Sequence, residues 1–132
     1  MCVSVLRRLV AGGVLFATVA AGEAAAAAPA DGAALFKQMC SACHQPAGQG
    51  IPGAFPRLAG DAFVAGDPKT VATLLLTGRR AMPNFSATLS NEQIAAVLTY
   101  VRTSWGNHAP PVTVADVAKA RAGASGSPRP RP

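Results

Sequence analysis

The sequence predicts an all-α domain with three main helices and long loops. Three capped apolar segments with helical spacing support this prediction, and no stretch shows the strict alternation of a half-buried strand. The 132 residues allow one domain, because a single core takes about 100 to 150 residues. Half of the residues are hydrophobic, which excludes wholesale disorder. Only the N-terminus has an apolar run near the ~18 residues of a membrane span, which excludes a polytopic membrane protein.

Residues 1–28 have the three-part pattern of a signal peptide. Arg7 and Arg8 form a positive region, residues 9–21 form an apolar region, and the Ala-rich residues 24–28 offer small-residue cleavage sites. The alternative is an uncleaved membrane anchor, for which the apolar region is short. We therefore expect export to the periplasm and removal of this segment. In the oxidising compartment the chain keeps two cysteines, Cys40 and Cys43.

The first helix is expected to begin after Asp31, a favourable N-cap, and to run into Cys40. Its apolar face carries Leu35, Phe36 and Met39. Residues 46–66 then contain five Gly and three Pro, which predicts a long loop. This loop is too apolar for a linker, and we expect five of its side chains to be buried: Ile51, Phe55, Leu58, Phe63 and Val64.

Capping signals mark the second and third helices. The second helix has Asp67 as N-cap, Pro68 at its first position and Gly78 as its stop, with Val71, Leu74 and Leu75 on its apolar face. The third helix begins with a capping box of Ser90 and Gln93 and ends before Gly106. Its apolar face is formed by Ile94, Val97, Leu98 and Val101.

The C-terminal part of the chain has weaker signals. Pro110 and Pro111 interrupt the chain, and Thr113 is a candidate cap for a short helix with Val114, Val117 and Ala118 on a thin apolar stripe. The folded domain is therefore expected to span residues 29–122. Residues 123–132 are rich in Gly, Ser, Pro and Arg, and we expect a disordered basic tail.

Residues 40–44 read Cys-Ser-Ala-Cys-His, which is the C-x-x-C-H pattern of covalent haem attachment. Two thiols three positions apart near a helical turn can form thioethers with the two vinyl groups of a porphyrin, and His44 then becomes the proximal iron ligand. A redox disulfide of the thioredoxin type needs a preceding strand, and a structural zinc site needs further ligands, for which His108 is the only other histidine. A chance match is the third alternative.

Met82 is the candidate for the ligand on the opposite face of the haem. It lies in the loop between the second and third helices and precedes Pro83, which favours an extended backbone at Met82. Met39 is unsuitable, because it adjoins Cys40 on the proximal side. The alternative for Met82 is that it fills a gap in the core. His/Met ligation raises the reduction potential and closes the iron to small ligands.

These motifs resemble those of the class I c-type cytochromes, from about residue 35 to residue 121. The resemblance implies a small cytochrome c fold around one haem c bound through Cys40 and Cys43. It also implies that Gly32, Phe36 and Tyr100 lie where the first and last helices cross, and that the Pro56 carbonyl accepts a hydrogen bond from the proximal imidazole. The matching segments are Leu35-Phe36, Gly48-Gln49-Gly50, Pro56-Arg57-Leu58-Ala59-Gly60, Met82-Pro83-Asn84-Phe85 and Tyr100-Val101-Arg102.

A narrower resemblance covers residues 103–107, 109–111 and 117–121. These segments are similar to the haem domains of cytochrome c subunits that serve membrane-bound alcohol, sorbitol, gluconate or aldehyde dehydrogenases. Such subunits usually carry three haem domains and a membrane tether, whereas this sequence accounts for one haem domain. The resemblance implies a dehydrogenase or an oxidase as redox partner.

We therefore expect a periplasmic electron carrier that performs no chemistry on a substrate. The alternatives are a five-coordinate haem protein with an enzymatic or gas-binding role, and a thiol redox protein. The net charge of +6 is compatible with an acidic partner or with peripheral membrane association. Binding to nucleic acid is not expected, because the basic residues are scattered and the chain is exported.

Three further expectations concern side chains around the haem. Arg79 and Arg80 are candidates for neutralising haem propionates or for partner docking, with solvated surface charge as the alternative. Trp105 is expected to be a half-buried ring at the end of the third helix, and His108 an exposed residue without a special role. The porphyrin is expected to pack against five apolar residues: Ile51, Leu58, Leu74, Leu75 and Leu98.

Overall fold

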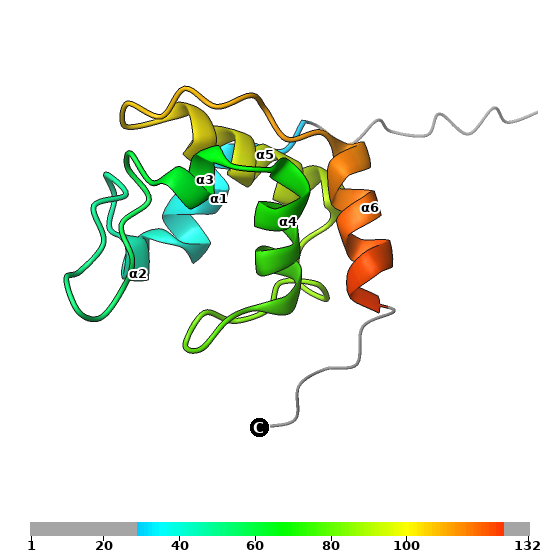
Figure 1. Ribbon diagram of the computed structural model, residues 1–132, viewed down its shortest axis with the longest axis horizontal. Coiled ribbons are helices and arrows are strands. Elements are labelled where there is room, and N and C mark those ends of the chain that lie inside the picture. Colours follow the sequence, from blue (N-terminus) through cyan, green and yellow to red (C-terminus); the bar gives the residue numbers. More distant parts are fainter. Residues whose placement is uncertain (1–28, 126–132) are drawn as a thin grey trace, which may run out of the picture.

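The computed structural model describes residues 29–125, so the predicted signal peptide and residues 126–132 of the predicted tail lie outside the described part. Within the described part the ordered elements are helices, and no strand forms beyond two isolated bridges, Ile51 with Phe55 and Arg79 with Met82. This confirms the predicted all-α class (Figure 1). The helices are α1 (Gly32–Met39), α2 (Ser41–His44), α3 (Ala62–Ala65), α4 (Pro68–Thr77), α5 (Asn91–Thr103) and α6 (Val114–Ser125).

Helices α1 and α5 pack against each other through a small residue and an aromatic cluster. A Cβ on Gly32 would collide with the main-chain carbonyl of Ala96 in α5, so the close approach requires glycine. Beside this contact the rings of Phe36 and Tyr100 lie 5.6 Å apart between centroids, and the Trp105 ring lies 4.9 Å from Phe36. The expected crossing at Gly32, Phe36 and Tyr100 is therefore confirmed.

The three predicted N-cap residues, Asp31, Asp67 and Ser90, are the N-caps of α1, α4 and α5. Asp31 accepts hydrogen bonds from the amides of Ala33 and Ala34, and Asp67 accepts one from Thr70. The side chain of Ser90 accepts from the Gln93 amide at 3.2 Å, while the Gln93 side chain accepts from the Ser90 amide at 2.9 Å. These bonds satisfy amides that the first helical turn leaves without partners.

Helix α6 corrects the prediction of a thin, short helix and of a tail that begins at residue 123. It continues through Ser125 and packs along α4, as Figure 1 shows for the orange and green helices. Its buried residues are Val117 and Ala120, which are 0% and 1% exposed, whereas Val114 is 42% exposed and Ala118 is exposed. Helix α6 therefore packs through the face that carries Val117 and Ala120, and not through the expected stripe of Val114, Val117 and Ala118.

The loop before α3 also departs from expectation. Val64 is buried, but Ile51 is 39% exposed and Phe63 is 44% exposed. Ile51 exchanges two main-chain hydrogen bonds with Phe55, at 2.9 and 2.8 Å, and this tight turn holds Ile51 away from the core. Phe63 lies in the four-residue helix α3, which buries only Val64.

Two buried polar side chains join this loop region to the end of α5. Arg102 is 1% exposed and donates to the carbonyls of Val64, Gly66 and Pro110 at 2.6, 2.8 and 2.9 Å. Asn107 is 5% exposed and bonds both to Gly60 in the loop and to Val101 in α5.

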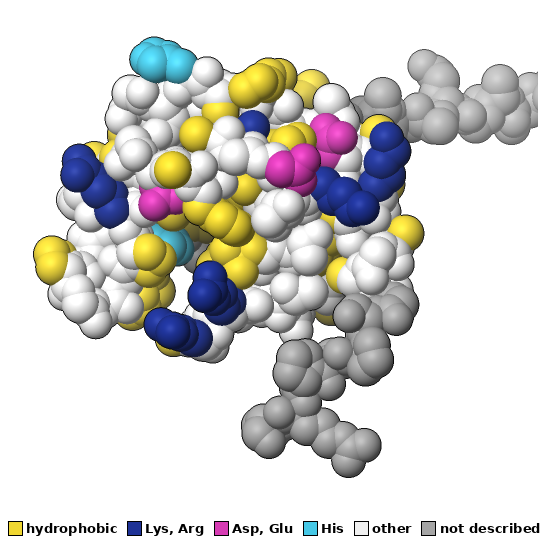
Figure 2. Space-filling model, viewed as in Figure 1, with side chains coloured by type: hydrophobic (Ala, Val, Ile, Leu, Met, Phe, Trp, Pro, Cys, Tyr) yellow, Lys and Arg dark blue, Asp and Glu magenta, His cyan; other side chains and the backbone are white. Residues whose placement is uncertain are grey.

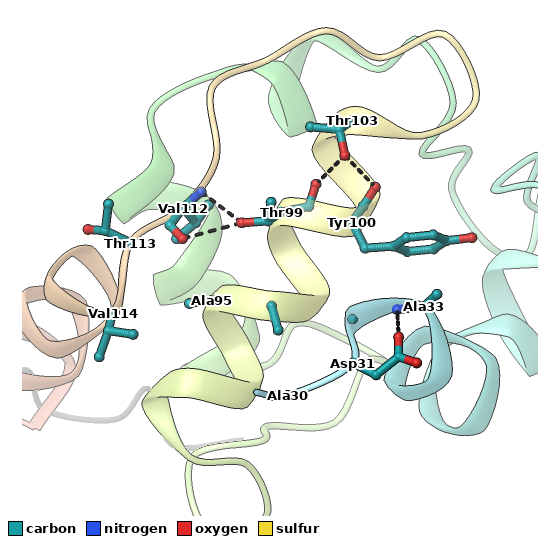
Figure 3. Close-up of a pocket in the computed structure, with 12 residues that line it drawn as sticks. Ala30, Asp31, Ala33, Ala95, Thr99, Tyr100, Thr103, Val112, Thr113 and Val114 are labelled. Atoms are coloured by element: carbon teal, nitrogen blue, oxygen red, sulfur yellow. Dashed lines mark hydrogen bonds between the residues drawn. The ribbon is translucent and has the colours of Figure 1, made fainter. Parts of the chain in front are cut away.

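The segment between α5 and α6 is attached to α5 as well. Thr99 of α5 exchanges hydrogen bonds with the main chain of Val112 (Figure 3).

Candidate functional site

The two cysteines and the buried histidine lie in one turn of helix. The Cys40 amide bonds to the Phe36 carbonyl as α1 ends, and the Cys40 carbonyl accepts from the amides of Cys43 at 3.2 Å and His44 at 2.9 Å. Both thiols are free; Cys40 is half-buried against the core, and Cys43 is exposed. The local helix therefore presents the two sulfurs and the imidazole together.

The Cys40 thiol is a poor nucleophile in this environment. Burial, with a smaller effect from Cys43, raises the pKa of Cys40 to about 11. A thiol redox protein needs a lowered thiol pKa, because the thiolate is the attacking species. The environment of Cys40 therefore does not favour the thioredoxin-type alternative.

His44 has its ring orientation fixed by the main chain. Its Nδ1 lies 2.9 Å from the Pro56 carbonyl oxygen, and the residue is 9% exposed. A carbonyl can only accept a hydrogen bond, so Nδ1 carries the proton and Nε2 of the neutral ring keeps its lone pair. This tautomer is the one that binds a metal through Nε2.

A loop with two left-handed glycines brings Pro56 to His44. Gly48 and Gly50 both have φ of +64°, and a Cβ on Gly50 would lie 2.6 Å from the Phe55 carbonyl oxygen and 2.7 Å from that of Pro56. The Gly48 carbonyl accepts from the amide of Leu58 at 2.7 Å. The chain can therefore fold back tightly over α2 only because these positions lack side chains.

Met82 lies in a separate loop that leaves α4 at Gly78. Arg79 and Met82 exchange two main-chain hydrogen bonds, at 3.1 and 3.0 Å, and a Cβ on Gly78 would lie 2.7 Å from the Met82 carbonyl oxygen. The Met82 side chain is partly buried and packs against the core cluster. The turn therefore holds the backbone of Met82 in one position.

A hollow opens between the loop after α2 and the loop after α4. Figure 2 shows hydrophobic side chains inside it, with a histidine among them and basic side chains at its lower rim. The loop after α4 contributes the exposed Arg79 and Arg80. A second groove of about 570 Å³ lies elsewhere, between the start of α1, α5 and Val112–Val114, and none of the predicted site residues line it (Figure 3).

These residues fit a covalently bound haem. Two free thiols in one helical turn, a buried imidazole with Nε2 available and an apolar hollow are the donors and the surface that a c-type haem needs. Within residues 29–125 no three His, Cys, Asp or Glu side chains gather at a common metal site. The same part of the chain contains no helix that is both long and apolar enough for a membrane span.

An all-helical domain with this turn of helix defines a c-type cytochrome. A family model described as cytochrome c oxidase, cbb3-type, subunit III matches residues 27–101. The chain is 39% identical over 118 residues to a cytochrome c-552 of Thermus thermophilus, a match that covers 74% of this chain and 78% of that protein. The chain therefore belongs to the cytochrome c family, and it binds haem c through Cys40 and Cys43.

Other relatives are subunits of dehydrogenases. The chain is 39% identical over 103 residues to the cytochrome c subunit of the quinone alcohol dehydrogenase of Gluconacetobacter polyoxogenes, and 34% identical over 104 residues to the gluconate 2-dehydrogenase cytochrome c subunit of Pantoea cypripedii. Each match covers 68% of this chain but only 22% and 24% of those proteins, so the chain spans about a fifth to a quarter of their length. The solved cytochrome c6 of the diatom Phaeodactylum tricornutum is 29% identical to this chain and has a TM-score of 0.45. The match covers 67% of this chain and 93% of that chain.

The cytochrome c family transfers electrons and performs no chemistry on a substrate.

Sequence reasoning missed the roles of two buried polar residues at and after the end of α5. Arg102 and Asn107 each make three hydrogen bonds to the main chain of other residues, and both are buried. A single polar residue near a helix end is usually exposed, so composition and spacing gave no sign of these bonds. The adjoining Trp105, which has φ of +54°, and Gly106 indicated a turn but not its partners.

Proposed function

We propose that the domain carries single electrons in the periplasm, with His44 and Met82 as the two axial ligands of its haem. The hydrogen bond from His44 Nδ1 to the Pro56 carbonyl carries this proposal. It selects the tautomer with the proton on Nδ1 and increases the basicity of the imidazole, as such bonds do in metal sites. Bound haem c supplies the Fe(III)/Fe(II) couple, and the residues of the chain hold and shield it.

Met82 supports a six-coordinate carrier over a five-coordinate haem protein. Its backbone is fixed by the hydrogen-bonded turn with Arg79, and its thioether belongs to a partly buried side chain. A thioether on one side and an imidazole on the other leave no open position for a substrate or a gas. This arrangement suits electron transfer, in which both ligands stay bound in both oxidation states.

The proposed donor is a dehydrogenase, and the proposed acceptor is a component of a respiratory chain. Two curated relatives are named as cytochrome c subunits of alcohol and gluconate dehydrogenases, which supports a partner of this kind. The pattern of residues 1–28 supports export. Arg79 and Arg80 are exposed in the loop after α4, and their positive charge favours an acidic face on the partner and is also compatible with peripheral contact to an anionic membrane surface.

The optical spectrum of the purified haem protein tests this proposal. We expect a low-spin spectrum with the ferric band near 695 nm that the family resemblance implies for His/Met iron, and no change on adding carbon monoxide. His44→Ala should lose this spectrum and accumulate little holoprotein. A high-spin spectrum that responds to carbon monoxide would favour the five-coordinate alternative, and a normal spectrum from His44→Ala would contradict the assignment of His44.

A further inference from the structure

Asn107 connects the end of α5 to the loop that carries Pro56. Its Oδ1 accepts from the Gly60 amide at 2.7 Å, and its Nδ2 donates to the carbonyls of Leu58 at 3.1 Å and Val101 at 2.8 Å. The residue is 5% exposed, so water does not compete for these groups. One amide side chain therefore fixes residues 58 and 60 relative to the helix.

Residues 58–60 are also bonded to the start of the same loop. The amides of Leu58 and Ala59 bond to the Gly48 carbonyl at 2.7 and 3.0 Å, and Gly48 in turn lies against the Trp105 ring. Pro56 lies only two residues before Leu58, and its carbonyl accepts the hydrogen bond from His44 Nδ1. The position of this acceptor therefore depends on where residues 58–60 are held.

We infer that Asn107 is a positioning residue for the axial imidazole, acting through the loop 56–60 and the Pro56 carbonyl. This inference rests on the proposed ligation by His44. Loss of the Asn107 side-chain amide leaves the Gly60 amide without a partner and removes the shorter of two hydrogen bonds to the Leu58 carbonyl, and the loop then opens more often. A weaker bond at Nδ1 makes the imidazole a poorer electron donor, which stabilises Fe(III) less and raises the reduction potential.

The test compares two variants of the haem protein. Asn107→Ala removes the side-chain hydrogen bonds to the loop. Val117→Ala removes two buried methyl groups in α6 and leaves those hydrogen bonds in place. In the reduced protein, NMR hydrogen exchange of His44 Nδ1–H should become about tenfold faster in Asn107→Ala than in wild type, and the potential should rise. Val117→Ala should lower the melting temperature and leave both readouts unchanged.

Exchange in the wild-type protein gives a second test, which remains available if Asn107→Ala does not accumulate. His44 Nδ1–H and the Gly60 amide should exchange through the same opening and respond equally to low concentrations of denaturant. Separate openings for these two hydrogens would overturn the inference, as would unchanged exchange and potential in Asn107→Ala. A wild-type spectrum without the signals of a coordinated histidine would instead refute ligation by His44, and the inference with it.

Discussion

Trp105 lies directly over Gly48, with the indole ring filling the space that a side chain at Gly48 would need. A Cβ on Gly48 would lie 2.5 Å from Cε3 of the ring, and the glycine has φ of +64°. Trp105 itself has φ of +54° and packs against Phe36 with 4.9 Å between centroids. The first residues after α2 are thereby pressed against the end of α5.

Gly48→Ala should destabilise the haem protein by about 2 to 4 kcal/mol, because it combines left-handed strain with overpacking against the ring. Gly53→Ala is the matched control: Gly53 has φ of +78° but no atom within 4 Å of the added Cβ. Gly53→Ala should therefore lower the free energy of unfolding only by the cost of the left-handed backbone, about 1 to 2 kcal/mol. Denaturant unfolding measures both, and equal losses would mean that Trp105 moves aside at no cost.

Met82→Ala should leave haem covalently attached through Cys40 and Cys43 while the iron becomes five-coordinate or binds water. The reduction potential should fall, because the thioether that favours Fe(II) is lost. Absorption spectra and redox titration check both effects. Met39→Leu is the control, since Met39 ends α1 beside Cys40 and the change nearly conserves its volume. A persistent 695 nm band in Met82→Ala would assign the ligand to another residue.

The haem is expected to be part of the core, so the apoprotein should not fold cooperatively. The hollow in Figure 2 is lined by hydrophobic side chains, and the large apolar side chains of Ile51 (39%) and Phe63 (44%) are left exposed. A domain of about 100 residues is only marginally stable. Cys40→Ala, Cys43→Ala protein made without haem should show weak helical circular dichroism and no sharp melt. A reversible cooperative transition would show that α4, α5 and α6 suffice.

Replacing Arg79 and Arg80 by Gln should slow oxidation of the reduced protein by ferricyanide at low ionic strength, by about two- to tenfold. The cationic oxidant tris(phenanthroline)cobalt(III) should react faster with the same variant. Lys69→Gln, Lys119→Gln carries the same change in net charge on exposed positions of α4 and α6 and should alter both rates less. Equal effects of the two double variants would show that only net charge matters.

Asp67→Asn should reduce the acid sensitivity of the protein. Hydrogen bonds from the amide and hydroxyl of Thr70 are the main cause that lowers the pKa of Asp67, so this carboxylate contributes stability above its ordinary pKa and loses it as pH falls through the lowered value. Asn caps a helix as well as Asp and does not titrate, so the stability of the variant should fall less below about pH 4. Melting temperatures measured from neutral pH into acid check this, with Asp67→Ala as the control that loses the cap at every pH.

Local signals in the sequence predicted the helices that begin with them. Asp67, Pro68 and Gly78 bound α4, and Ser90 with Gln93 begins α5, because capping depends on residues a few positions apart. The C-x-x-C-H turn was equally readable. The Pro56 carbonyl, which lies 12 residues after His44 in the chain, accepts the hydrogen bond from the His44 ring, as the family resemblance implied.

The parts that differ from the prediction depend on contacts between distant segments. Arg121 of α6 donates to Asn91, Ser86 and Leu89, which lie 30 to 35 residues earlier in the chain, and these bonds attach the C-terminal half of α6 to the segment before α5 and the start of α5. The exposure of Ile51 follows from its pairing with Phe55 in a turn whose orientation the sequence does not encode locally. Arg102 and Asn107 are polar residues whose burial exists only in the assembled domain.

The buried guanidinium of Arg102 makes one part of this protein indifferent to proton concentration. Arg102 bonds only to main-chain carbonyls, those of Val64, Gly66 and Pro110, and neither a guanidinium nor a carbonyl changes its charge across the pH range in which proteins unfold. The carboxylate caps at Asp67 and Asp116, by contrast, are neutralised in acid. Acid should therefore weaken the starts of α4 and α6, while the three hydrogen bonds of Arg102 keep their strength.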